Sequence, residues 1–172
     1  PIDYYYLDYR GSNGGFNQRK CVSKWLYDQR KKHNDDTRLG WFKDGNQGSE
    51  LTGENVNYGQ VKLMAKDIGT LTGDIIFMRA EEMLLIQAEA KARLGLYTDA
   101  RNLLKDLAKV RFTTTTAVNN YNQYLDNLSN ANTLTESTIV EPTNVLEEVM
   151  LQKRIELWGE YGRIKDILRL KH

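Results

Sequence analysis

Two glutamates, Glu82 and Glu89, are the residues of this sequence whose type and spacing come closest to acid–base chemistry. They lie seven positions apart in the stretch RAEEMLLIQAEA, about two turns apart on one predicted helix. A carboxylate pair can hydrolyse a glycosidic bond when one group donates a proton and the other acts as base or nucleophile. The sequence supplies no nucleophile–base pair and no other constellation around them. We therefore predict that the protein is not an enzyme.

Residues that bind metals or form disulfides are few. Cys21 is the single cysteine, so no disulfide can form within the chain. The two histidines, His33 and His172, lie far apart and have no partner at ligand spacing. The stretch NDDTR, residues 34–38, lacks the ligand spacing of a calcium-binding EF-hand and is better explained as a turn and a cap. We predict no metal and no cofactor.

The charge of the chain gives little reason to expect a nucleic-acid partner. The net charge is +1, so no global field selects a polyanion. One region, Arg19–Arg38, holds seven Lys or Arg and three Asp, and with Trp25 it imitates a nucleic-acid patch. The same region also fits one helix with a solvated basic face. The opposite side of that helix would be formed by Val22, Trp25, Leu26 and Gln29, which share helical spacing. We favour the helix and predict no nucleic-acid binding.

Length and composition are those of a globular protein. The chain has 172 residues, 40% hydrophobic and 27% charged, which allows one domain over residues 1–172 with a real core. No apolar run reaches the roughly 18 residues that a membrane-spanning helix needs. The sequence begins at Pro1 without a methionine or signal peptide and stops within a predicted helix. We interpret it as a piece of a longer, or a processed, polypeptide.

Residues 79–111 carry the clearest helical pattern and predict a hairpin of two helices. The first helix has two rows of apolar residues, Ala80, Leu84, Ala88 and Ala92 beside Met83, Ile86, Ala90 and Leu94. The alanines would let a partner helix approach closely. Gly95 suits a left-handed helix end, and Thr98 or Asp99 can cap the next helix. The apolar stripe of that second helix is formed by Ala100, Leu103, Leu104 and Leu107.

Residues 144–170 predict a C-terminal helix pair. Helical spacing is kept by Val145, Val149, Leu151, Ile155 and Leu157. Gly159 and Gly162 should break or kink the helix before residues 164–170.

Most of the remaining sequence is expected to be loop. We predict a short helix at residues 22–32, a strand at 4–7 and extended segments at 61–65 and 73–78. Residues 112–143 contain no Lys or Arg but eight Thr and six Asn, and predict a long loop with a short helix near 121–128. A loop of that length is either functional or a surface insertion. The predicted fold class is mainly α, an irregular helical domain with long loops.

The hairpin carries two resemblances. The stretch LGLYTDARNLL, residues 94–104, resembles the turn of a tetratricopeptide unit, and Gly95 and Tyr97 recur as Gly159 and Tyr161. The first helix also resembles a motif of the SusD/RagB-type surface lipoproteins, through Arg79, Glu82, Leu84, Leu85, Ala88, Glu89 and Ala90. The family's turn and second helix are matched by Gly95, Ala100, Val110 and Arg111. Glu81 stands where the family usually has alanine.

The end of the chain resembles the closing motif of the same family. The stretch QKRIELWGEYGRIKDILR supplies Arg154, Glu156, Leu157, Glu160, Gly162, Arg163, Asp166, Ile167 and Arg169, with Gln152 in place of a glutamate. Residues 35–38, DDTR, resemble the family's Asp-x-Arg. The order of these motifs from Val22 onwards makes the resemblance specific to the C-terminal part of the family.

The resemblance implies a cell-surface lipoprotein of the outer membrane, with its lipid anchor outside this chain. Such a protein captures a glycan, or in some members a peptide, and delivers it to a SusC-like TonB-dependent transporter. It implies binding without catalysis. An alternative is a tetratricopeptide-like scaffold that binds a protein or peptide in a helical groove.

Glycan binding needs flat apolar faces beside polar side chains, held on loops. Trp41 is the best candidate because it lies in a polar, glycine-rich stretch with Asn46 nearby. Tyr9 and Tyr58 are further candidates, and a core or loop-anchoring role is the alternative for each aromatic residue. The charged residues of the motifs are expected to form structural ion pairs, because a buried charge requires a partner. They are Arg79, Glu82, Arg154, Glu156, Arg163 and Asp166.

Overall fold

The computed structural model describes residues 22–31, 35–43, 59–60, 62, 78–134 and 141–160. Within these ranges the chain is mainly helical, which confirms the predicted fold class. It divides into two compact units, residues 1–77 and 78–172, each of which is considered by itself. No helix in the described ranges is long and apolar enough to cross a membrane. The strand predicted at 4–7 lies outside the described residues, and so do the extended segments predicted at 61–65 and 73–78 apart from residues 62 and 78.

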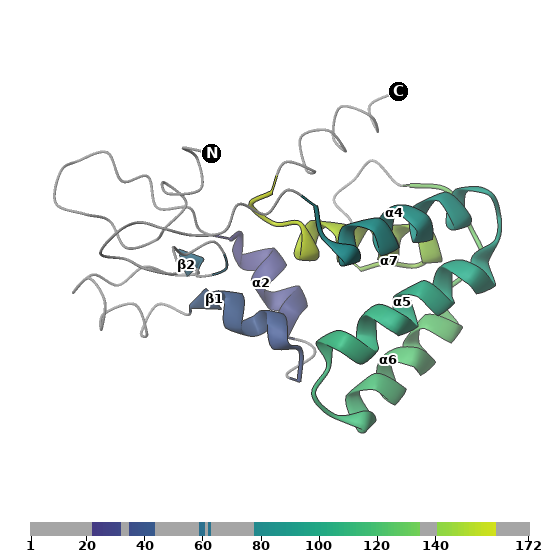
Figure 1. The fold of residues 1–172 in the computed structure, drawn as a ribbon. Helices are drawn as coiled ribbons and strands as arrows, with labels where there is room; N and C mark the ends of the chain where they lie inside the picture. The colour runs from purple at the N-terminus through teal and green to yellow at the C-terminus, as the bar shows by residue number, and fades with distance from the viewer. Residues whose placement is uncertain are drawn as a thin grey trace, which may run out of the picture. The chain divides into compact units, whose positions relative to one another are not determined.

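The first unit contains short elements (Figure 1). Helix α2 spans Lys24–Lys31 and the 3-10 helix η1 spans Thr37–Trp41. Strands β1, Phe42–Lys43, and β2, Gly59–Gln60, pair antiparallel with Phe42 opposite Gln60. Helix α2 contacts η1. Of the predicted apolar side, Leu26 and Val22, which precedes the helix, are buried at 6% and 2% exposed, whereas Trp25 and Gln29 are half-buried.

In its described residues, the second unit contains four helices (Figure 1). They are α4, Ala80–Arg93; α5, Tyr97–Arg111; α6, Thr115–Asn127; and α7, Val145–Glu156. Helix α4 packs against both α5 and α7, and α5 packs against α6. The predicted hairpin over residues 79–111 is therefore present as α4 and α5.

The core of this unit is closely packed where the hairpin helices meet. Ala88 and Ala92 on α4 and Ala100 on α5 are fully buried, which is the close approach that the alanines predict. Larger side chains fill the space toward α6 and α7, namely Leu85, Leu104, Leu107, Phe112, Tyr121, Leu125, Leu146 and Val149. The helices hold together through this shared core.

The second predicted row of α4 is not in the core. Ile86 and Leu94 are 45% and 75% exposed, and Ala90 is exposed as well. The buried stripe lies one position to the side and includes Leu85 and Glu89. Helical period alone could not choose between these neighbouring rows, and the ion partners of Glu89 make its burial possible.

The predicted turn of the hairpin is confirmed at Gly95, but the predicted cap of the second helix is wrong. Gly95 has φ +77°, the left-handed conformation expected of a glycine that ends a helix. Helix α5 begins at Tyr97, so its N-cap is Leu96, which makes no side-chain cap bond. Thr98 and Asp99 are therefore already helical and cannot cap α5. Asp99 instead forms an ion pair with Lys91 at 3.0 Å.

Residues 112–134 are more helical than the sequence suggested. Helix α6 covers 13 residues in place of the predicted short helix near 121–128. Thr114 caps it by accepting from the Ala117 amide, and Tyr121 and Leu125 anchor it in the core. Packing has overridden the low helix propensity of its Thr and Asn residues.

Helix α7 begins and ends near the predicted positions. Asn144 caps it by accepting from the Glu147 amide at 3.0 Å, and its side chain also donates to the Thr133 carbonyl at 3.1 Å. The helix ends at Glu156, and Gly159 follows with φ +79°, so the predicted break is confirmed there. Gly162 and the second helix of the predicted pair lie outside the described residues.

Candidate functional site

The Asp-x-Arg stretch at residues 36–38 is a buried ion pair that fixes η1. The Asp36 carboxylate accepts from the Arg38 amide at 2.8 Å and from its guanidinium at 2.8 and 3.0 Å. Both residues are 2% exposed. A buried bidentate pair of this kind holds its backbone in one geometry. It therefore fixes the start of the short helix that ends at Trp41.

Trp41 is half-buried at the end of η1. The Lys62 ammonium lies 4.7 Å from the centroid of its ring, which is cation–π distance. A flat indole with a cation over one of its faces combines an aromatic surface with a hydrogen-bond donor. These are the two kinds of group that a sugar requires.

The other predicted ligand-binding residues cannot be placed beside Trp41. Tyr9, Asn46 and Tyr58 lie outside the described residues. Their roles stay predictions.

The second unit contains a buried charge network centred on Glu156, which is fully buried at the end of α7. Its carboxylate accepts from Arg79 at 2.8 Å and from Arg111 Nε at 3.1 Å. Arg79 also lies 3.0 Å from Glu160, and Arg111 lies 2.6 Å from Glu81. Burial alone would lower the pKa of Arg79, but the charges of Glu160 and Glu156 raise it above its ordinary value. The network joins the start of α4 to the ends of α5 and α7.

The remaining predicted ion-pair residues differ from one another. Glu82 is half-buried and has no ion-pair partner among the described residues, whereas the preceding Glu81 pairs with Arg111. Arg154 is half-buried on α7, and Arg163 and Asp166 lie outside the described ranges.

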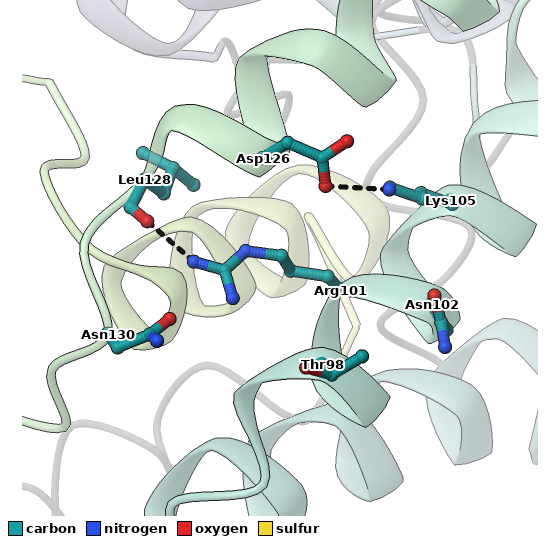
Figure 2. Close-up of a pocket in the computed structure, with 7 residues that line it drawn as sticks. All are labelled: Thr98, Arg101, Asn102, Lys105, Asp126, Leu128 and Asn130. Atoms are coloured by element: carbon teal, nitrogen blue, oxygen red, sulfur yellow. Dashed lines mark hydrogen bonds and ion pairs between the residues drawn. The ribbon is translucent and has the colours of Figure 1, made fainter.

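A polar depression of about 360 Å³ lies between the start of α5 and the end of α6. Figure 2 shows its lining residues, Thr98, Arg101, Asn102, Lys105, Asp126, Leu128 and Asn130. No motif in the sequence marks these residues as a binding site. A signal was present, since residues 112–143 are rich in Asn and Thr and were expected to be functional or an insertion. The partners from α5 could only be found from the packing of the two helices.

The sequence was compared with models of known protein families. A model of the SusD family matches residues 4–172. The chain belongs to the SusD family. Proteins of this family bind nutrients at the cell surface, are typically associated with the outer membrane and are not enzymes. No match was found to a curated protein or to a solved structure.

In this SusD-family chain the buried carboxylates of the second unit are already engaged by the protein. Glu89 pairs with Lys153 at 2.9 Å and with Arg93 at 2.8 Å. Glu82 and Glu89 are therefore not a free catalytic pair, because the second carboxylate is held between two cations. Across the described ranges, no group of three or more His, Cys, Asp or Glu residues could hold a metal ion.

A second buried carboxylate of the SusD-family chain is bound by hydroxyl and amide groups. Glu148, 1% exposed, accepts from the hydroxyls of Tyr121 and Tyr124 and from the Gln152 amide. Burial of the Tyr124 hydroxyl and its proximity to Glu148 raise the pKa of Tyr124 far above its ordinary value. The hydroxyl thus remains a donor to Glu148, which joins α6 to α7.

Proposed function

We propose that this chain captures a glycan, or a peptide, at the cell surface and delivers it to a SusC-like TonB-dependent transporter. The observation that carries the proposal is the family match over residues 4–172. We further propose that the protein is an outer-membrane lipoprotein and that capture is passive, without turnover.

Trp41 is the proposed centre of the capture surface. Lys62 covers one face of the half-buried indole, so the hydrogen-bearing face of a sugar ring would stack on the opposite face, and the ammonium could donate to a hydroxyl. The buried Asp36–Arg38 pair limits the motion of η1, so less conformational entropy is lost on binding. Tyr9, Asn46 and Tyr58 are proposed as further ligand contacts.

The charged motif residues are proposed to support the fold and to take no part in binding. Arg79 and Glu156 are directed at each other across two helices of the second unit. The same structural role is proposed for Glu82, Arg154, Arg163 and Asp166.

Native gels that contain individual polysaccharides test the proposed capture. The full chain should be retarded by one glycan, and Trp41→Ala should lose most of that retardation. Trp41→Tyr is the matched variant, because it keeps an aromatic face and should keep much of the binding. Retardation unchanged in Trp41→Ala would contradict the proposed site. No retardation by any glycan would contradict glycan capture, and a peptide library would then test the peptide alternative.

One observation favours the alternative of a tetratricopeptide-like interaction scaffold. The hairpin exposes apolar side chains, with Ile86 45%, Leu94 75% and Val110 62% exposed. Ile86 lies on α4, and Leu94 is the residue that caps its C-terminal end. If this surface binds a protein, Leu94→Ser should weaken that binding and Trp41→Ala should not. The opposite pattern would exclude the scaffold function.

A further inference from the structure

The depression between α5 and α6 presents polar groups that the protein itself does not use. Thr98, Asn102 and Asn130 are exposed, and their side chains make no hydrogen bond to any described residue. Thr98 and Asn102 belong to α5, whereas Asn130 follows α6 on the opposite side (Figure 2). Donors and acceptors from two chain segments therefore face one hollow.

Arg101 is held in place between these side chains. Its Nε donates to the Leu125 carbonyl at 2.8 Å and one Nη donates to the Leu128 carbonyl at 2.5 Å. Both bonds fix the guanidinium against the end of α6, and Figure 2 shows the one to Leu128. No described residue accepts from its other Nη, so that edge retains two N–H donors. An oriented guanidinium edge suits a carboxylate.

The charges of the lining sum to one positive charge. Lys105 and Asp126 form an ion pair at 2.7 Å and cancel each other, which leaves Arg101. The start of α5 and the end of α6 contribute partial charges of about +0.5 and −0.5, which also cancel. A monoanion therefore matches the site better than a cation, a dianion or a neutral molecule.

The lining also distinguishes a sugar from a peptide side chain. Its one apolar residue, Leu128, is 8% exposed, so the lining offers little apolar surface to a hydrophobic side chain, and a sugar would be held here by hydrogen bonds without stacking. The hydroxyl and two amides each offer both a donor and an acceptor, as the hydroxyls of a sugar require. The volume of about 360 Å³ is within the range of small-ligand sites.

From these observations we infer that the depression binds an acidic sugar unit, with the carboxylate of a uronic acid on Arg101 and its hydroxyls on Thr98, Asn102 and Asn130. The inference rests on the proposed capture of glycans and names their chemical class. The residues of this site all belong to the second unit, whereas Trp41 belongs to the first.

Two-dimensional amide NMR of the full chain tests this site, with D-glucuronate, D-glucose and acetate as probes. Glucuronate should shift the signals of Thr98, Arg101, Asn102 and Asn130, while glucose and acetate should shift them much less. Asn102→Ala and Asn130→Ala should each weaken glucuronate binding about two- to tenfold, as expected for one lost hydrogen bond. Asn120→Ala is the matched control, because Asn120 is an exposed asparagine of α6 that does not line the depression.

Any of three results in the titrations of the unaltered chain would overturn the inference. They are no shift with glucuronate, equal shifts with glucose, or equal shifts with acetate, which would show a simple carboxylate site. Binding that is unchanged in both asparagine variants would also place the sugar elsewhere. The gel assay with Trp41→Ala is independent of these outcomes. Retardation by a neutral glycan together with no glucuronate shift would therefore refute this site and leave the proposed function standing.

Discussion

Replacing Glu156 by glutamine should destabilise the second unit, because it removes a buried charge that lies between two partly buried arginines. The substitution conserves shape, so it creates no cavity. Glu156 is fully buried, and its carboxylate contacts both Arg79 and Arg111. The side-chain carbonyl of glutamine can still accept from one arginine. Its NH2 group, however, would face the N–H donors of the second arginine, which it cannot accept.

The expected loss is about 3 kcal/mol in the free energy of unfolding. Removing one partner of a buried ion pair typically costs about 3–5 kcal/mol. The lower end applies here because each arginine keeps one carboxylate, Arg79 with Glu160 at 3.0 Å and Arg111 with Glu81 at 2.6 Å. A domain is commonly stable by only about 5–15 kcal/mol, so the loss would be large.

Urea unfolding followed by far-UV circular dichroism measures this loss. Asp106→Asn is the matched control, because it breaks an exposed pair with Lys109 in which the side chains are 55% and 64% exposed. The control should lose less than about 0.5 kcal/mol. If Glu156→Gln also lost less than about 1 kcal/mol, the charge network would not hold the three helix ends together.

Other substitutions in the second unit test single contacts by the same unfolding measurement. Gly95→Ala should lower the free energy of unfolding by about 1–2 kcal/mol. Gly95 has φ +77°, and a Cβ added there would meet nothing within 4 Å, so the cost is backbone strain alone. An unchanged free energy of unfolding would contradict the left-handed turn. Asn144→Ala should lower the free energy of unfolding by about 1–2 kcal/mol, because α7 loses its N-cap. An unchanged urea midpoint would contradict the capping role of Asn144. The raised pKa of Tyr124 gives a stabilisation that is fully present below about pH 10 and is lost as pH rises from there toward the folded pKa. Tyr124→Phe should therefore reduce the alkaline loss of stability, and an identical pH profile in both proteins would refute that assignment.

The helix hairpin could be predicted because its local signals agree with its packing. Gly95 ends α4, and the small residues Ala88, Ala92 and Ala100 lie where the two helices meet. Local sequence and tertiary contacts favour the same structure there. Helix α7 is predictable for the same reason.

The parts that could not be predicted depend on contacts between distant residues. Glu89 is buried on α4 because Lys153, 64 positions later, pairs with it, and no local pattern indicates that pair. Helix α6 forms from poor helix formers because Tyr121 and Leu125 reach the core. The candidate sites show the same division. The polar, glycine-rich sequence around Trp41 marks it as a candidate, whereas the depression at Arg101 is formed by two segments that only the fold brings together.

Capture without turnover is the central claim, and one paired measurement tests it most directly. A glycan that retards the full chain is titrated into it in a calorimeter, and the same mixture is then assayed for newly formed reducing ends. We expect saturable binding heat and no reducing ends above those of the glycan alone. Reducing ends that increase in proportion to protein and time would show hydrolysis and would contradict a binding protein.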